Sequence, residues 1–582
     1  MIDHTLNDEQ QLALRPGVKL IEAGPGAGKT RTVVERMNVQ STPASGIALI
    51  SFTNAAADEA KRRTTGTEVT NPPNFIGTFD KFLHMFVVTP WHLRTYGIRP
   101  NYVDSWDDLG SGLQFVRHSA VRGPGLKLSS FSLAGNGKMS YPDTIQSADR
   151  VYANQLLRAG HSPSDLTNLA SRTIQSLLDR GLYDCDCARF QALEILKSDE
   201  SWLTDRLSRR FSEIIVDEFQ DCSESELKIV EALIGLDISV VVVADPDQAI
   251  YEFRQASPSI YKQYRQSLNP ASITELTTNY RSTPAICQLV NSLRIIGKSP
   301  AKSVHNDDDS SIFILVGSPS FQREQQSALL AGANIPVHKS LVLSHRKKDS
   351  ALLAGIAVDS SGSDHRTFRI LRIAATLRTS RSTRIRKDEV RKLGIILVDL
   401  FDWDKSVLRT SEKRELLELS DSALGSIASG LLHKSVGWDD AEIARDQIVS
   451  YLEEALPPSD IPRKSLRVAL QKLKEEHWVW WAAALSNASN VVFPASHIHA
   501  VKGLEFDAVL LALNASSRNP SNVLDDWEIG ESTDALRVLY VGASRAKKLL
   551  SIASPPKSAD QLRRVLNSHG VPTTWMIEEG AF

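Results

Sequence analysis

The sequence has 582 residues, of which 42% are hydrophobic and 23% charged, and this length allows several domains. The formal net charge is -2, so bulk charge argues neither for nor against nucleic acid, and any basic surface must be local. No run of about twenty apolar residues is present, and the polar N-terminus lacks the apolar core of a signal peptide. These features argue against a membrane protein and favour a cytoplasmic one.

The first informative pattern is a predicted strand, loop and helix near the N-terminus. A short apolar strand at residues 18–23 is followed by the loop GPGAGKT and then by a predicted helix from residue 31. This context is typical of a phosphate-binding loop, because glycines allow backbone N–H groups to point at a phosphate. The lysine would reach the β- and γ-phosphates, and the threonine hydroxyl would hold Mg²⁺. The loop residues predicted to bind the nucleotide are Gly24, Gly26, Gly28, Lys29 and Thr30.

The next stretch, residues 85–205, is predicted to be helical, with a loop rich in Gly and Ser from Gly123 to Gly137. Cys185 and Cys187 are one residue apart in this stretch. The pair could be half of a metal site, but two free thiols are favoured because no second Cys/His pair completes a ligand set. No disulfide framework is expected.

Two later apolar runs end in residues suited to nucleotide hydrolysis. Residues 214–216 lead into Asp217 and Glu218, and the C-terminal end of a buried strand is where an α/β sheet places catalytic groups. Asp217 would bind Mg²⁺, and Glu218 would polarise the attacking water. A solvated acidic turn is the alternative, which the upstream loop disfavours. Residues 240–244 form a β-branched strand before Gln248, whose amide can contact a phosphate and a water together.

A basic segment extends from Arg366 to Lys392, with ten Lys or Arg residues against two acidic ones. Such a concentration could bind DNA phosphates, or it could be the solvated face of a helix. Both readings stay open here. Neutralising Arg381, Arg384 and Arg386 should flatten the salt dependence of DNA binding only if the segment contacts DNA.

Taken in chain order, these runs resemble the motifs of the UvrD/Rep/PcrA helicases of superfamily 1. The matches extend from residue 6 to about residue 546, and their order is far more specific than any single run. They are LNDEQ at 6–10, SFTNAAA at 51–57, GTF at 77–79, DEFQD at 217–221, DPDQAIY at 245–251 with Phe253 and Arg254, NYRS at 279–282, His499 with KGLEF at 502–506, and Tyr540, Val541, Ser544, Arg545 and Ala546.

The resemblance implies an ATP site completed from both halves of the chain. Arg281 and Arg545 would reach the γ-phosphate from the second of two RecA-like domains, as arginine fingers that stabilise the charge of phosphoryl transfer. The predicted catalytic residues are then Lys29, Asp217, Glu218, Gln248, Arg281 and Arg545. The further nucleotide contacts that the resemblance implies are Gln10 at the adenine, Tyr280 on the base, Glu505 at the sugar, and Arg31 and Gly503 nearby.

The resemblance also implies that rings and polar side chains contact single-stranded DNA. Stacking on a ring contributes roughly 1–3 kcal/mol per base and tolerates any base sequence. Core packing is the alternative for each ring. The predicted DNA contacts are Phe52, Thr53, Asn54, Thr78, Phe79, Tyr251, Phe253 and His499. This set departs from the family pattern more than the catalytic set does: Asp80, Glu252 and Phe253 stand where the family usually has His, Gly and Trp.

The resemblance implies an α/β fold with two RecA-like P-loop NTPase domains, each built on a parallel sheet and carrying a mostly helical accessory insertion. We expect the first RecA-like domain at residues 1–85 and 205–270, with its insertion at 86–204. The second is expected at residues 271–360 and 486–582, with its insertion at 361–485, where the family carries a mobile domain. No nuclease domain is expected after Arg545.

These features predict a Mg²⁺- and ATP-dependent motor that moves 3′ to 5′ on single-stranded DNA or on a 3′-tailed duplex. An alternative is an ATP-hydrolysing DNA sensor that unwinds little and regulates a nuclease partner in a repair or phage-defence complex. A P-loop switch without nucleic acid is disfavoured by the order of the motifs. A 3′-tailed duplex separates the first two, because only the motor separates its strands.

Overall fold

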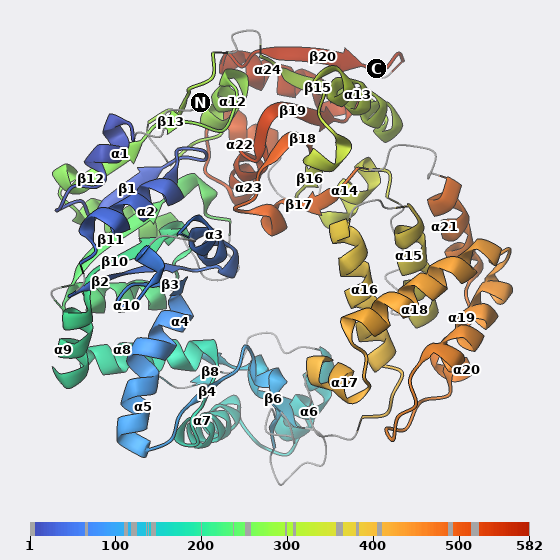
Figure 1. Ribbon diagram of the computed structural model, residues 1–582, viewed down its shortest axis with the longest axis horizontal. Helices are drawn as coiled ribbons and strands as arrows, with labels where there is room; N and C mark the ends of the chain where they lie inside the picture. Colours follow the sequence, from blue (N-terminus) through green and yellow to red (C-terminus); the bar gives the residue numbers. More distant parts are fainter. Residues whose placement is uncertain are drawn as a thin grey trace.

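Two parallel β-sheets, each flanked by helices, organise the protein in the computed structural model (Figure 1). The structure describes residues 6–42, 44–64, 68–109, 115–117, 125–134, 137, 139–140, 147–198, 201–236, 238–250, 258–296, 299–306, 310–356, 365–379, 383–403, 410–486, 493–513 and 523–580. The prediction of an α/β fold with two RecA-like domains on parallel sheets is confirmed. The exact domain boundaries given above remain our proposal.

The first sheet has six parallel strands in the order β12-β1-β11-β10-β2-β3. Its strands are β1 (Leu20–Ala23), β2 (Gly46–Ser51), β3 (Phe75–Thr78), β10 (Phe211–Asp217), β11 (Ser239–Ala244) and β12 (Ile273–Leu276). Its helices are α1 (Asp8–Leu12), α2 (Lys29–Gln40), α3 (Asn54–Thr64), α10 (Glu224–Ile234) and α11 (Pro258–Ser267). Because β1, β11 and β10 are parallel neighbours, the loops that follow them meet at one edge of the sheet.

The second sheet also has six parallel strands, in the order β17-β16-β18-β19-β15-β20. Its strands are β15 (Ile312–Val316), β16 (Ser340–Ser344), β17 (Ala495–His497), β18 (Phe506–Ala512), β19 (Ala546–Ser554) and β20 (Thr573–Ile577). Its helices are α12 (Pro284–Ser292), α13 (Pro319–Gly332), α14 (Lys347–Leu353), α22 (Val523–Ile529), α23 (Asp534–Ala543) and α24 (Ala559–Ser568). A short strand pair, β13 (Thr278–Asn279) and β14 (Lys302–Ser303), lies where the chain passes from one sheet to the other.

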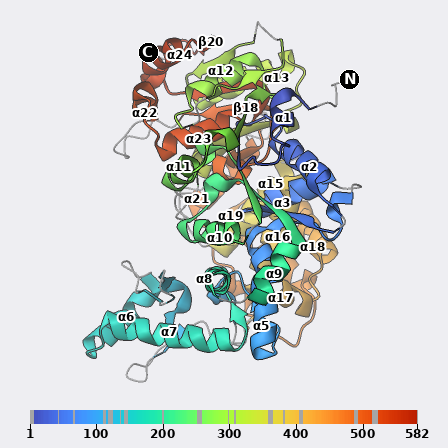
Figure 2. The same cartoon turned by 90° about the vertical axis from the view of Figure 1, so that its left-hand side faces the viewer.

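The first insertion lies between β3 and β10 and shares its core with the first sheet. Its helices are α4 (Phe79–Leu83), a π-helical turn (His84–Val88), α5 (Thr89–Tyr96), α6 (Ser147–Arg158), α7 (Pro163–Asp179), α8 (Cys185–Lys197) and α9 (Ser201–Arg210). Figure 2 shows α6 and α7 projecting away from the remainder of the molecule. Buried side chains from the sheet and from the insertion, such as Leu20, Phe82 and Leu177, belong to one continuous cluster.

Short strands form within and beside the stretch predicted as a Gly/Ser-rich loop. These are β5 (Phe115–Val116) with β6 (Leu126–Lys127), and β7 (Ser132–Leu133) with β8 (Met139–Ser140), beside the pair β4 (Asn101–Tyr102) and β9 (Leu182–Tyr183). The loop prediction, Gly123 to Gly137, is wrong at β6 and β7, and the helical prediction is wrong at the other four strands. Leu126, Leu128 and Met139 are buried, and their apolar side chains hold these segments against the insertion.

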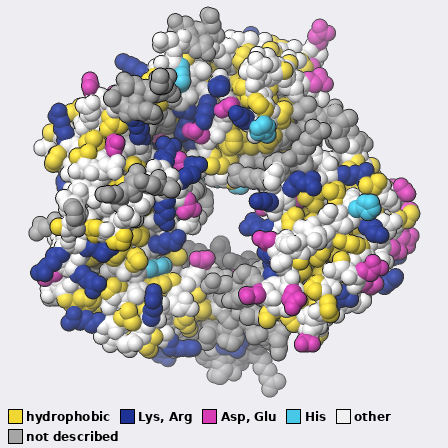
Figure 3. All heavy atoms as spheres, in the orientation of Figure 1, with side chains coloured by type: hydrophobic (Ala, Val, Ile, Leu, Met, Phe, Trp, Pro, Cys, Tyr) yellow, Lys and Arg dark blue, Asp and Glu magenta, His cyan; other side chains and the backbone are white. Residues whose placement is uncertain are grey.

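The second insertion follows α14, precedes β17 and has a core of its own. Its helices are α15 (Arg366–Thr379), α16 (Thr383–Val398), α17 (Thr410–Leu416), α18 (Asp421–Lys434), α19 (Ala441–Ala455), α20 (Leu466–Ala469) and α21 (Glu475–Ser486). The buried side chains of this cluster all fall between Phe368 and Trp481. Figure 3 shows an opening through the molecule, bordered on both sides by Lys and Arg side chains. Among the described residues, no helix is long and apolar enough to cross a membrane.

Candidate nucleotide site and nucleic-acid interface

The phosphate-binding loop forms as predicted between β1 and α2, and the second half of the chain sits directly on it. Gly26 and Gly28 have φ of 75° and 79°, in the left-handed region that favours glycine. The backbone N–H of Tyr280 donates to Gly26 O at 2.9 Å, and Asn279 Nδ2 donates to Pro25 O at 2.8 Å. A Cβ added to Gly26 would lie 2.7 Å from Asn279 Oδ1. This glycine therefore also allows the close contact between the two halves.

Lys29 and Glu218 are bound to each other in this structure, with 2.9 Å between Nζ and Oε1. Glu218 has φ of 57°, a strained conformation for a residue other than glycine and one found most often at functional sites. Burial opposes its charge, but Lys29 and Lys502 outweigh this effect and lower the pKa of Glu218. Burial next to Glu218 raises the pKa of Asp217. A bound phosphate would compete for Lys29 and release the Glu218 carboxylate toward water.

Gln248 is buried at the end of β11 and held from both sides of the cleft. Its Nε2 donates to Asp245 Oδ2 at 2.7 Å, and its Oε1 lies 3.4 Å from Arg545 Nη2. Asp245 also accepts a hydrogen bond from the hydroxyl of Tyr540, on α23, at 3.0 Å. The sequence motifs included Asp245 and Tyr540 without assigning them a role. The structure shows that they align the glutamine.

Arg281 and Arg545 both lie at this cleft. Arg281 Nε donates to Glu505 at 2.9 Å, and its Nη1 donates to Ser544 O at 3.1 Å. Arg545 is only 2% exposed. Burial and the charge of Arg281 lower the pKa of Arg545 to about 10. Two neighbouring cations in a buried cleft favour an anion between them, which is what an arginine-finger pair requires.

Gln10 and Tyr280 are the residues predicted to contact the adenine base. Gln10 is 1% exposed and donates from Nε2 to Ala27 O at 3.3 Å, while its Oε1 caps its own helix. Tyr280 is half-buried, and burial raises the pKa of its hydroxyl, an effect that the charge of Arg31 opposes.

Glu505, the predicted sugar contact, is paired with two cations in this structure. It binds Arg281 and Lys547, and this pairing explains why its pKa is lowered although burial opposes the shift. Gly503 has φ of 85° and allows the chain to turn before Glu505. The pairing holds Arg281 in place, and the sugar contact of Glu505 stays a prediction.

The candidate Mg²⁺ ligands fit the chemistry of that ion. Thr30 lies at the start of α2 and Asp217 at the end of β10, and both supply oxygen. The part of the chain that the structure describes contains no cluster of three or more His, Cys, Asp or Glu side chains that could hold a metal by themselves. Mg²⁺ commonly takes one or two protein ligands, with the remainder from phosphates and water.

A buried ion pair across the cleft was not predicted. Lys502, after β17, donates from Nζ to Asp221 Oδ1 and Oδ2 at 2.7 and 2.6 Å and to Gln248 O at 2.9 Å. The two side chains are 8% and 3% exposed. Lys502 and Asp221 both belong to the motifs given above, but 281 residues separate them, so the sequence did not predict that they pair. Lys502 therefore joins the second half of the chain to the acidic run.

Two of the predicted DNA contacts serve the fold instead. Phe79 is 1% exposed and packs in the core, so its ring cannot stack on a base. Phe52 is half-buried and stacks on Phe79, with 5.2 Å between ring centroids. The Thr78 hydroxyl caps α4 by accepting from Lys81 N at 3.3 Å. Phe52 is therefore the ring that this surface presents, and Phe79 supports it.

Of the remaining predicted DNA contacts, some are exposed or half-buried, and the others lie outside the described residues. Thr53 is half-buried, and Asn54 is exposed at the start of α3. His499 is half-buried, with ring centroids of His345 and His497 at 5.7 and 6.4 Å. Tyr251 and Phe253, with the departure Glu252, lie outside the described residues.

The basic segment folds as α15 and α16, and part of its charge is used within the protein. Arg378 donates to Ser435 O at 2.9 Å, and Arg386 donates to Leu377 O. Lys392 binds Asp388 at 2.7 Å, whereas Lys387 is exposed. Arg381 and the side chain of Arg384 lie outside the described residues. The segment is thus partly a structural feature, and its DNA contact remains a prediction.

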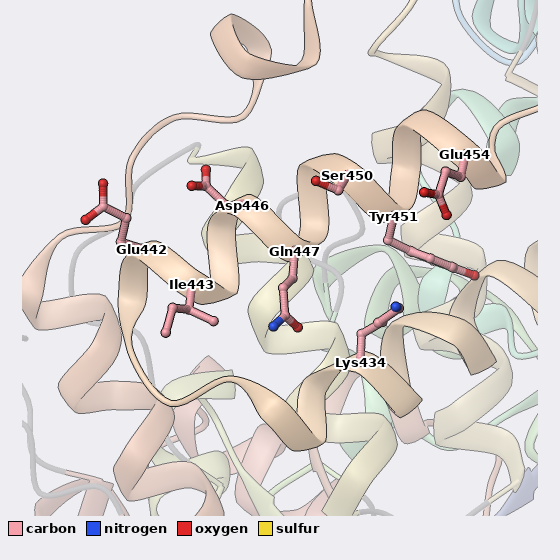
Figure 4. A pocket seen from close by; sticks show the side chains of 8 residues that line it. All are labelled: Lys434, Glu442, Ile443, Asp446, Gln447, Ser450, Tyr451 and Glu454. Carbon is pink, nitrogen blue, oxygen red and sulfur yellow. The ribbon is translucent and has the colours of Figure 1, made fainter.

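The same insertion has an open pocket between α18 and α19 (Figure 4). Three carboxylates, Glu442, Asp446 and Glu454, line it, with a single cation, Lys434. An acidic lining repels phosphate. This pocket is therefore not part of a nucleic-acid path.

Comparison with known families agrees with the motif order. Residues 6–269 match the UvrD/REP helicase N-terminal domain, and residues 482–555 match the UvrD-like helicase C-terminal domain. The first match contains the phosphate-binding loop and the acidic run, and the second contains Lys502, Glu505 and Arg545.

Individual relatives carry helicase names. The chain is 28% identical over 312 residues to DNA helicase II of Haemophilus influenzae, covering 50% of this chain and only 40% of that protein. It is 24% identical over 588 residues to the ATP-dependent DNA helicase UvrD2 of Mycobacterium tuberculosis, covering 94% and 78%. It is 23% identical over 675 residues to the ATP-dependent DNA helicase srs2 of Schizosaccharomyces pombe, covering 97% and 73%. The two family matches together show that the chain belongs to the UvrD/REP helicase family.

Proposed function

We propose that this protein hydrolyses ATP with Mg²⁺ in the cleft between its two sheets and uses the energy to move 3′ to 5′ along single-stranded DNA. The observation that carries the proposal is the composition of the cleft. Lys29, Glu218 and Gln248 come from the first sheet, whereas Arg281 and Arg545 come from the second half. Such a site is complete only when the halves are together, so hydrolysis and relative motion are coupled.

The predicted roles follow from this arrangement. Lys29 and the two arginines would neutralise the phosphates, Thr30 and Asp217 would hold Mg²⁺, and Glu218 would orient the attacking water. Mg²⁺, when bound, supplies charge neutralisation between the phosphates. Phe52 would stack on a base, and His499 would contact the DNA backbone.

The first test is ATP hydrolysis with and without single-stranded DNA, followed by unwinding of duplexes with a 3′ or a 5′ tail. We expect DNA to raise the rate several-fold and only the 3′-tailed duplex to be unwound. An ATP hydrolysis rate that does not change when DNA is added would contradict the proposed motor. Preference for a 5′ tail would reverse the proposed polarity.

Stimulated hydrolysis without strand separation would instead favour the DNA-sensor alternative. The relatives described above have DNA helicase names, and none of those names mentions a nuclease or defence against phage. The nuclease partner therefore gains no support beyond the initial alternative.

A further inference from the structure

The side chain of Asp80, an acid at the predicted DNA face, is held by an arginine from the first insertion. Arg189, on α8, donates from Nε to Asp80 Oδ1 at 2.7 Å and from Nη2 to Asp80 Oδ2 at 2.9 Å. A bidentate contact fixes the relative orientation of a guanidinium and a carboxylate. The same Nη2 lies 3.4 Å from Glu226 Oε1. One guanidinium thus binds carboxylates on two other helices, α4 and α10.

These three side chains are largely shielded from water. Asp80 is 26% exposed, Arg189 is 23% exposed and Glu226 is 6% exposed. Burial disfavours the cation, but Glu226 and Asp80 outweigh it and raise the pKa of Arg189. Shielded ion pairs are screened by salt much less than surface pairs, and removal of one member leaves the others uncompensated.

One end of the triad lies at the predicted DNA face. Asp80 follows Phe79 directly, and Phe79 supports the ring of Phe52. Asp80 is also in the first turn of α4, whose cap is Thr78. A shift of this surface on binding a strand would therefore move the carboxylate that Arg189 holds.

The other end lies at the start of α10, which follows the acidic run of the nucleotide site. Glu226 accepts from Ser223 N at 2.7 Å and from Ser223 Oγ at 2.8 Å, which closes the capping box of α10. Ser223 is two residues after Asp221, the partner of Lys502 across the cleft. Helix α8 packs against both α4 and α10, so Arg189 lies between the two helices whose carboxylates it binds.

We propose that Arg189 is a positioning residue that couples DNA contact at the start of α4 to the acidic run before α10, by holding Asp80 and Glu226 together. The inference rests on the proposed DNA-stimulated hydrolysis. It also explains how an acid is accommodated at the predicted DNA face: the carboxylate is paired with Arg189, which links α4 to α8. Without the guanidinium, two carboxylates would face each other and α4 and α10 would no longer move together.

The test measures ATP hydrolysis against the concentration of a single-stranded oligonucleotide, together with DNA affinity, for wild type, Arg189→Gln, Arg189→Lys and Asp80→Asn. We expect an unchanged rate without DNA, an unchanged DNA dissociation constant, and a stimulation that falls by about 5-fold or more in Arg189→Gln. Arg189→Lys should recover part of it, because it keeps the charge but not the bidentate contact. Adding Asp80→Asn to Arg189→Gln should cause no further loss.

Lys127→Gln serves as the matched control, because it removes another cation of the same insertion that pairs with Asp107 at 3.3 Å. It should leave stimulation unchanged. Equal stimulation of wild type and all Arg189 and Asp80 variants would overturn the inference while leaving the proposed function intact. A parallel loss of DNA affinity would also overturn it, because it would indicate direct contact. No stimulation of the wild type would overturn both.

Discussion

The nucleotide cleft and the predicted DNA face differ in how their residues are used. In the cleft, the predicted charged residues meet one another or the second half of the chain, as in the Lys29–Glu218 and Arg281–Glu505 pairs. On the DNA face, Thr78 caps a helix and Phe79 fills the core. A buried charge is costly and is retained for a purpose, whereas a phenylalanine or threonine has ordinary structural uses. The predicted charged residues therefore come together in the cleft, whereas Thr78 and Phe79 have structural uses.

The largest expected effect lies in the cleft. Glu218→Gln should lower the ATP turnover rate by about 10²–10⁴-fold, because an amide cannot accept the proton of the attacking water. Nucleotide binding should persist, since Lys29 stays. Steady-state hydrolysis and binding of a fluorescent ATP analogue would measure both. Glu224→Gln, an exposed acid of α10 that pairs with Lys228, is the control. Comparable turnover in the two variants would show that Glu218 is not the base.

The unpredicted ion pair should show in stability. Lys502→Met leaves Asp221 buried without its cation, which costs about 3–5 kcal/mol for a buried pair. The melting temperature should therefore fall, and adding Asp221→Asn should recover part of the loss, because a neutral amide is easier to bury. Thermal unfolding followed by circular dichroism would measure this. An unchanged melting temperature for Lys502→Met would show that the pair does not hold the cleft together.

The DNA face should respond differently to its two stacked rings. Phe52→Ala should weaken single-strand binding by roughly 1–3 kcal/mol, because one stacking surface is lost. Phe79→Leu should mainly lower stability, because its ring lies in the core. Fluorescence anisotropy with a labelled oligonucleotide and thermal unfolding would separate these effects. A reversed pattern, with Phe79 controlling affinity and Phe52 controlling stability, would contradict the assignment of the rings.

The smallest effect concerns His499, a predicted DNA contact, and His497, whose ring centroid lies 6.4 Å from that of His499. Burial, together with the neighbouring charges of His345, His497 and Lys502, lowers the pKa of His499, and burial and Lys347 lower that of His497. Both are therefore neutral at pH 7 without DNA and gain charge as the pH falls. DNA affinity should rise modestly as the pH is lowered from about 8 to about 5.5.

The double variant His497→Ala, His499→Ala should lose this dependence in the same anisotropy titration. Because folding lowers both pKa values, the stability contributed by the neutral rings is present above the unfolded pKa and declines as the pH falls through it. Each titration should therefore be paired with a folding check. A wild-type affinity that does not change with pH would contradict phosphate contact by these rings.

Much of the cleft could be predicted because its residues occur in short runs at the ends of apolar strands. The loop before Lys29 and the acidic run after Val216 could be recognised as nucleotide-binding segments from their residue types and from the apolar strands that precede them. Contacts between distant segments could not be predicted in this way. Lys502 meets Asp221, and Arg189 meets Asp80, only because the sheets and helices pack as they do. Whether a ring such as Phe79 faces inward is likewise decided by packing.

The separate core of the second insertion has a consequence for how this protein can be altered. Its first and last helices, α15 and α21, pack against each other and close the insertion on itself. Its buried side chains lie between Phe368 and Trp481 and are distinct from the cores of both sheets. We expect that this insertion can be lengthened, trimmed or replaced by a short linker while the second sheet keeps its strand order.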